Sequence, residues 1–220
     1  MGTSLATLLV LADGRLPAGG HAHSGGLEAA VAAGRVTDLA GLAGFLRGRL
    51  ATAGVVGAGF AAAACARTDE WAELDAGLDA RTPSPALRRA SRAQGRALLR
   101  AGRAIWPAPH PSLAISAAPH HPVALGLVAA DAGLRPREAA AAAAHGTLTG
   151  SASAAVRLLG LDPYGVHALL ADLAQACDRI ADDADARAGD PVDALPAAGA
   201  PLLDIGAEFH ATWEVRLFAS

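Results

Sequence analysis

Apolar residues recur along this chain at the spacing of helical turns. Over residues 39–50, Leu or Phe returns every three or four positions, which places these side chains on one face of an α-helix. Thr37 or Asp38 can cap the start of this helix, and Arg47 and Arg49 are expected on its outer face. No useful length of the chain alternates apolar and polar residues with the period of a strand. The pattern predicts an all-α protein, a bundle of about eight to ten helices.

Start and stop signals divide the rest of the chain into further helices. Gly160 ends one predicted helix and Asp162-Pro163 begins the next. The charge-free run 50–66 falls short of the about 20 residues that a membrane span needs, so we expect a buried core helix there. The remaining helices are expected at residues 27–33, 87–105, 123–132, 136–149, 152–159 and 164–186.

The composition fits closely packed helices in one domain. Of the 220 residues, 52% are apolar but only 4% are aromatic, and alanine makes up roughly a quarter, which favours helices. No spacer is long enough to separate two cores, although the Pro/Ala-rich stretch 189–201 reads as a linker. We therefore expect a helical body over residues 1–201, and a C-terminal helix and docking tail of the same domain over residues 202–220.

Several classes of protein are excluded by what the chain lacks. All 18 basic residues are arginine, so there is no lysine for a Schiff base or for a P-loop. Cys65 and Cys177 are isolated, which is typical of buried thiols in a reducing compartment, and no secretion signal is recognisable. These features predict a cytoplasmic protein without a membrane span.

An arginine-rich segment suggests a charged surface. Arg88, Arg92, Arg96 and Arg100 repeat every four residues, and no acid occurs from Arg81 to Arg103. Three interpretations stay open: neutralisation by the acidic segments 69–79 and 178–190 or by solvent, binding of an acidic protein, and binding of nucleic acid. The last is the weakest, because no aromatic residues are interleaved for base stacking and the net charge is -3.

No catalytic or metal-binding constellation is recognisable. His21 and His23 lie in a Gly-rich loop and His120-His121 in a Pro-rich loop, but neither pair has a third ligand nearby in sequence. The glycines of residues 57–62 resemble a dinucleotide-binding turn, yet they follow a predicted helix rather than the strand that such a turn requires. We expect no enzyme activity, no cofactor and no resident metal.

The C-terminus is apolar where most chain ends are small and polar. Trp213, Val215, Leu217 and Phe218 surround Arg216 in the last eleven residues. Such a tail is suited to docking on the protein's own body or on a partner.

The tail and a Gly-rich N-terminal stretch resemble the UreF family of urease accessory proteins. Four ordered blocks carry the resemblance over nearly the whole chain. They are Asp13, Leu16-Pro17, Gly19, His23-Ser24 and Gly26-Leu27-Glu28; Leu87-Arg88, Ala90-Ser91 and Gly95-Arg96; His121-Pro122 to Gly126 with Ala155-Val-Arg157-Leu158; and His210, Arg216-Leu217-Phe218 and Ser220.

The resemblance implies a scaffold in nickel metallocentre assembly, with no chemistry of its own. Such a protein works as a dimer with the accessory protein UreD/UreH, recruits the GTPase UreG and helps to deliver nickel to apo-urease. The tail would become ordered against the body when UreD/UreH binds, with Arg216 as the family's tail arginine. The candidate partner-binding residues are His21, His23, Ser24, Glu28, Arg88, Arg92, Arg96, His210, Arg216, Leu217 and Phe218.

One alternative comes from another class of function. A helical regulator could bind a small molecule in a pocket of the Ala-rich segment 54–64. A regulator needs an output module such as a helix-turn-helix, and none is recognisable in the sequence.

Overall fold

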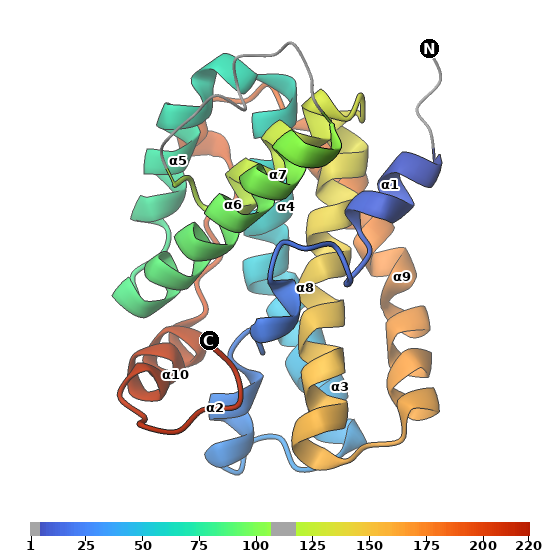
Figure 1. The fold of residues 1–220 in the computed structure, drawn as a ribbon, viewed down its shortest axis with the longest axis vertical. Helices are drawn as coiled ribbons and strands as arrows, with labels where there is room; N and C mark the ends of the chain where they lie inside the picture. Colours follow the sequence, from blue (N-terminus) through green and yellow to red (C-terminus); the bar gives the residue numbers. More distant parts are fainter. Residues whose placement is uncertain (1–4, 107–117) are drawn as a thin grey trace.

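The computed structural model describes residues 5–106 and 118–220, and these ranges contain helices and no strand (Figure 1). The prediction of an all-α bundle is confirmed. A π-helical turn, Leu50–Gly54, joins two of the helices, and short 3-10 turns lie at Gly20–Ala22, Thr68–Glu70 and Val192–Ala194. The α-helices are α1 (Leu5–Leu11), α2 (Leu27–Ala32), α3 (Leu39–Arg49), α4 (Val55–Ala66), α5 (Trp71–Ala80), α6 (Pro85–Ile105), α7 (His121–Asp131), α8 (Pro136–Leu159), α9 (Pro163–Ala186) and α10 (Pro201–Ala211).

Helix α4 is the centre of the bundle and packs against α7, α8 and α9. Its residues from Val56 to Cys65 are all buried. Alanine and glycine allow close packing: a Cβ at Gly126 of α7 would lie 2.3 Å from the backbone oxygen of Ala61. The continuous helix Leu39–Ala66 is long and apolar enough to cross a membrane, but 67% of its most apolar window is buried inside the protein. The expected core helix is confirmed.

The predicted helix boundaries have the expected caps. The carboxylate of Asp38 accepts a hydrogen bond from Gly41 N at 2.7 Å, and that of Asp162 accepts from the N–H groups of Tyr164 and Gly165. Gly160 ends α8 with a φ of 62°, a left-handed conformation that favours glycine.

Residues 136–159 form one helix, so the prediction of two helices broken near Gly150 is wrong. Glycine and serine have low helix propensity and weaken a helix locally, but tertiary packing offsets this loss of stability. The hydroxyl of Ser151 is buried and donates to Ser24 O at 2.9 Å. Ser151, between the two predicted helices, is thus held in the helix by a distant loop.

The stretch 189–200 is packed against the body, so its interpretation as a linker is also wrong. Arg67 donates to the carbonyls of Ala188 and Asp190, and Arg81 donates to several carbonyls between Val192 and Pro196. Val192 and Leu195 are buried beneath them. This segment leads the chain to α10, which packs on α2 and α6 and brings the C-terminus near the N-terminal loop (Figure 1).

Candidate functional site: the docked C-terminal tail

The C-terminal tail (residues 212–220) lies on the N-terminal loop (residues 19–26). Two backbone hydrogen bonds join the segments, from Ala219 N to Ala22 O at 2.7 Å and from Ser24 N to Ser220 O at 2.6 Å. The buried hydroxyl of Ser24 also donates to Ser220 O at 2.8 Å, and His23 Nδ1 lies 2.7 Å from the Ser220 hydroxyl. Three residues of the loop and two of the tail, almost two hundred positions apart in sequence, are thus joined by a set of hydrogen bonds.

Glu28, in the first turn of α2, binds the backbone of the tail. Its Oε1 accepts from Leu217 N at 2.8 Å, and its Oε2 accepts from Phe218 N at 3.0 Å and lies 2.8 Å from His210 Nε2. Burial by itself raises the pKa of Glu28, but hydrogen bonds from His210 and from the two backbone N–H groups outweigh it, so the pKa lies below its ordinary value. The carboxylate charge therefore favours the docked tail.

Phe218 is the apolar anchor of the tail. Its side chain is 4% exposed and packs in the cluster that contains Leu27 and Leu46. The guanidinium of Arg157 lies over the ring, with Cζ 4.7 Å from the ring centroid. Docking thus buries an aromatic side chain as well as forming polar contacts.

The loop that receives the tail is shaped by glycine and fixed by Arg49. Gly25 and Gly26 have φ values of 65° and 90°, which other residues rarely adopt. Arg49 was predicted to face outward, but it turns inward and donates to Gly25 O at 2.5 Å and Thr147 O at 3.2 Å. Burial lowers its pKa to about 10. Sequence reasoning missed both Arg49 and Ser151, because the carbonyls that they bind lie in other segments.

Six predicted residues meet at this site, whereas Arg216 and the side chain of Leu217 are exposed and form none of its hydrogen bonds. The residues that meet are His23, Ser24, Glu28, His210, Phe218 and, through its backbone, Leu217. Arg216 is exposed and lies beside a groove of about 360 Å³ between α6, α10 and the tail. His21 is exposed as well, and its ring forms no hydrogen bond with any other described residue.

An apolar ridge lies next to the docked tail. Leu202, Ile205 and Phe209 follow helical spacing on α10, and their side chains are 64%, 67% and 64% exposed. Trp213 packs edge-on against Phe209, with ring centroids 5.8 Å apart. Contiguous exposed side chains of this size are typical of an interaction surface.

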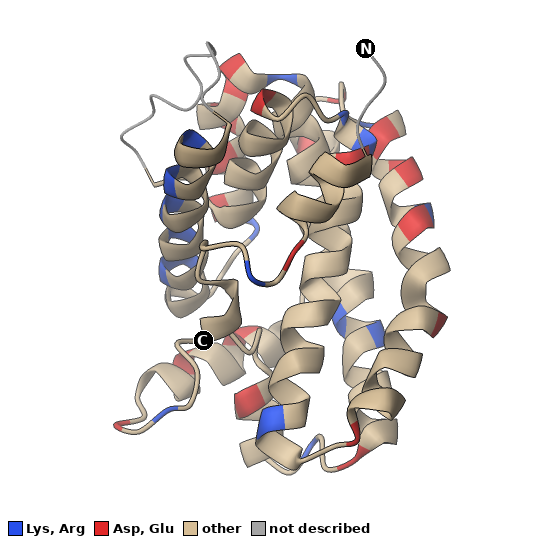
Figure 2. Cartoon of the chain, turned by 45° about the vertical axis from the view of Figure 1, so that its right-hand side comes forward, with Lys and Arg blue, Asp and Glu red and all other residues tan. Residues whose placement is uncertain are grey.

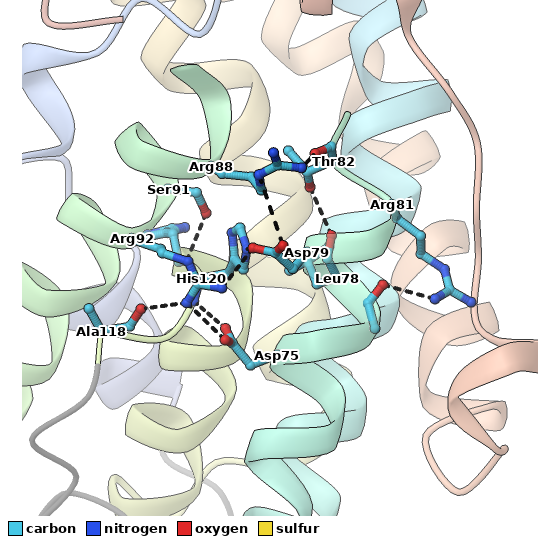
Figure 3. A network of polar contacts seen from close by, with 12 residues as sticks. Asp75, Leu78, Asp79, Arg81, Thr82, Arg88, Ser91, Arg92, Ala118 and His120 are labelled. Carbon is cyan, nitrogen blue, oxygen red and sulfur yellow. Dashed lines mark hydrogen bonds and ion pairs between the residues drawn. The ribbon is translucent and has the colours of Figure 1, made fainter. Parts of the chain in front are cut away.

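The predicted arginines of α6 lie apart from the tail and divide into two groups. Arg92 binds Asp75 at 2.8 Å and Asp79 at 2.7 Å, and Arg88 lies 3.9 Å from Asp79 (Figure 3). Arg96 is exposed. Neutralisation by the acidic segment 69–79 is thus confirmed for two arginines. The prediction that the acidic segment 178–190 neutralises the arginines of α6 is wrong, because its Asp178 and Asp182 pair with Arg137 instead.

The two histidine pairs have different environments. His120 is buried and its Nε2 lies 3.0 Å from Asp79, in the network of Figure 3. Burial, with a smaller contribution from nearby His23, lowers the pKa of His121 to about 4. Across residues 5–106 and 118–220, no group of three or more His, Cys, Asp or Glu side chains is arranged to hold a metal ion.

A larger cavity of about 810 Å³ lies between the N-terminal loop and α8. It touches the segment 54–64 only at its start, through Val56 and Gly57. Ala58 and the residues from Phe60 to Ala64 are fully buried in the core, so within the described chain this cavity reaches only the start of the segment in which a small-molecule pocket was expected.

Comparison with known proteins identifies the family. The family model described as UreF matches residues 36–174. The chain is 51% identical to a urease accessory protein UreF of Mycobacterium sp. (strain JLS), with 99% of this chain and all of that protein aligned. Proteins of the same name from Mycolicibacterium vanbaalenii and Mycobacterium tuberculosis (strain H37Ra) are 47% and 45% identical, again over 99% of this chain and their full lengths. The chain belongs to the UreF family of urease accessory proteins.

Proposed function

We propose that this chain is a non-catalytic, cytoplasmic scaffold for nickel metallocentre assembly. As a dimer it binds UreD/UreH and recruits the GTPase UreG for the activation of apo-urease. Membership of a family of urease accessory proteins supports a role in urease maturation. The assignment of partners to surfaces rests on the arrangement of α10 and the tail.

The observation that carries the proposal is the apolar ridge of α10. Leu202, Ile205 and Phe209 are each about two-thirds exposed, although each could bury an area worth roughly 2 kcal/mol. A helix that already uses its inner face against α2 and α6 has this outer face left for a partner. We assign the ridge to UreD/UreH, because its apolar character is that of the buried centre of an interface.

The docked tail supplies the second surface. Glu28 and the N-terminal loop bind the backbone of residues 217–220, and this binding leaves the side chain of Arg216 exposed. We assign Arg216 to the capture of UreG. The tail is docked in the isolated chain, so the partner's part is to increase the fraction of molecules in the docked state.

The experiment is a pull-down from cells that co-express the N-terminally tagged chain with the UreD and UreG of its host. Replacing Leu202, Ile205 and Phe209 by Gln removes the ridge, and glutamine keeps the helix propensity of α10. The matched control replaces Leu5, Leu9 and Tyr164 by Gln, which are exposed to a similar or greater extent. Loss of UreD with the ridge variant alone supports the assignment. Loss with the control alone, or with neither variant, overturns it.

Arg216→Ala separates the two partners. It leaves every contact of Glu28 in place, so UreD should be recovered as before while UreG is lost. Arg187→Ala, at another exposed position, is the control. Full recovery of UreG with Arg216→Ala would show that this arginine has no part in capture. Truncation of the chain after Ala207 is a less specific test of Arg216, because it also removes all three groups that bind Glu28.

A further inference from the structure

The arginines of α6 that are not neutralised form a row on its outer face. Arg89, Arg96 and Arg100 are exposed and lie at i, i+7 and i+11, so they share a face about 16 Å long. Figure 2 shows basic positions along α6 and no acidic position on this helix. Asp75 and Asp79 bind Arg88 and Arg92, which lie on the adjoining part of the helix surface. We call Arg89, Arg96 and Arg100 the outer arginine row.

The surroundings of the row do not cancel its charge. No Asp or Glu occurs in the sequence between Asp79 and Asp131, and no member of the row forms an ion pair within the described ranges. The nearest influence is on Glu208 of α10, whose pKa is lowered first by Ser84 and Ala86 and to a smaller extent by Arg89. Arg96 and Arg100 are four residues apart and repel each other, which weakens the isolated helix. An acidic ligand would remove that repulsion.

Small residues beside the row allow a close approach. Ala86, Ala90 and Ala93 of α6 line the groove of about 360 Å³, together with Ala207 and Ala211 of α10, and Arg89 lies at its edge. Side chains this short would let another helix lie along α6 at small interaxial distance. The surface is therefore a basic edge beside a groove whose walls on α6 and α10 are rich in alanine.

We propose that this surface binds an acidic amphipathic helix of a protein partner. Carboxylates at the spacing i, i+7 and i+11 would meet the arginines one by one, and small apolar residues would occupy the alanine-lined channel. A protein is favoured over nucleic acid, because the row holds no aromatic residue for stacking and the chain has a net charge of -3. Arg216 also lines this groove, so the inference shares a surface with the proposed capture of UreG, and the test below uses a peptide and the row arginines alone, without UreG and without a change at Arg216.

The test measures binding of the full chain to a fluorescein-labelled helical peptide by fluorescence anisotropy. The peptide carries Glu at i, i+4, i+7 and i+11 on one face and Ala beside them, and its control has Gln in place of Glu. The chain is compared with a variant in which Arg89, Arg96 and Arg100 are replaced by Gln. A second variant, with Arg47, Arg179 and Arg187 replaced by Gln, has the same net charge and changes other exposed positions.

The expected result is saturable binding of the Glu peptide only. The row variant should bind it about tenfold more weakly, because it loses three exposed ion pairs, and the charge-matched variant should bind as the unchanged chain does. Equal weakening in both variants would mean attraction by net charge alone and would overturn the proposal. So would absence of binding, or row-dependent binding of a duplex DNA in place of the peptide. Circular dichroism confirms that both variants keep their helices.

Discussion

Oε2 of Glu28 lies 2.8 Å from Nε2 of His210, which joins the start of α2 to the end of α10 inside the protein. The same carboxylate accepts the backbone N–H groups of Leu217 and Phe218. One side chain therefore orients both the last helix and the tail that follows it. Its removal should affect the tail more than the rest of the bundle.

Glu28→Gln should loosen the tail without unfolding the body. The carboxamide has one acceptor oxygen where the carboxylate has two, so at least one of the three bonds is lost, at about 1–3 kcal/mol for a buried group. Hydrogen exchange at the amides of Leu217 and Phe218 measures this directly and should become faster. Glu73→Gln, on the exposed side of α5, is the control. Unchanged protection at both amides would contradict the role given to Glu28.

Tail docking should depend on pH through Glu28. Its pKa in the docked state lies below the ordinary 4.5, so the undocked state binds a proton first as the pH falls. The contribution of the carboxylate is thus fully present above pH 4.5 and is lost as the pH falls through the lowered pKa. Hydrogen exchange of the tail amides, measured as a function of pH and corrected for the intrinsic rate, should show this loss. Glu28→Gln should remove it.

His121 should make the whole fold less stable in weak acid. Its pKa is about 4 in the folded protein against an ordinary 6.5, because burial disfavours the charged ring. The unfolded chain therefore takes up the proton first, and the free energy of unfolding should fall between pH 6.5 and about 4. Urea unfolding of the protein and of His121→Asn over this range should give a smaller slope for the variant. An NMR titration of the His121 ring near 6.5 would refute the prediction.

Phe218→Ala should detach the tail from the body and have only a small effect on the melting temperature. Phe-to-Ala changes in a closed core cost about 3–5 kcal/mol, but a terminal segment can detach, which limits the cost to the free energy of docking. Trypsin cleavage after Arg216, followed by mass spectrometry, should therefore become faster. Val215→Ala changes a side chain that is 89% exposed and should leave the cleavage rate as it was. Equal rates for the two variants would show that Phe218 does not anchor the tail.

Sequence signals within a few residues of each helix end were sufficient to predict most of the fold. Asp38, Asp162 and Gly160 act through backbone groups within a few residues, so their effects can be predicted from neighbouring sequence. The continuity of α8 could not be predicted this way, because Ser151 is held by a carbonyl 127 positions earlier. The same reason explains the error at Arg49, whose helical position indicates only a direction and not which carbonyls lie there.

The candidate site could be predicted as a set of residues but not as a geometry. The family resemblance pointed to Glu28, His210 and the tail, and these residues meet in the structure. Periodicity could not separate the neutralised arginines, Arg88 and Arg92, from Arg96, because the acids that select them are on α5.

The separation of Glu28 from its tail partners has a consequence for biosynthesis. Residues 217–220 leave the ribosome after every other part of the described chain, and the remaining helices pack mainly with one another. Helix α2 and the loop before it are therefore complete while their ligands are still being translated. Until residues 217–220 are released, the carboxylate of Glu28 lacks the two backbone N–H groups that it binds in the finished protein.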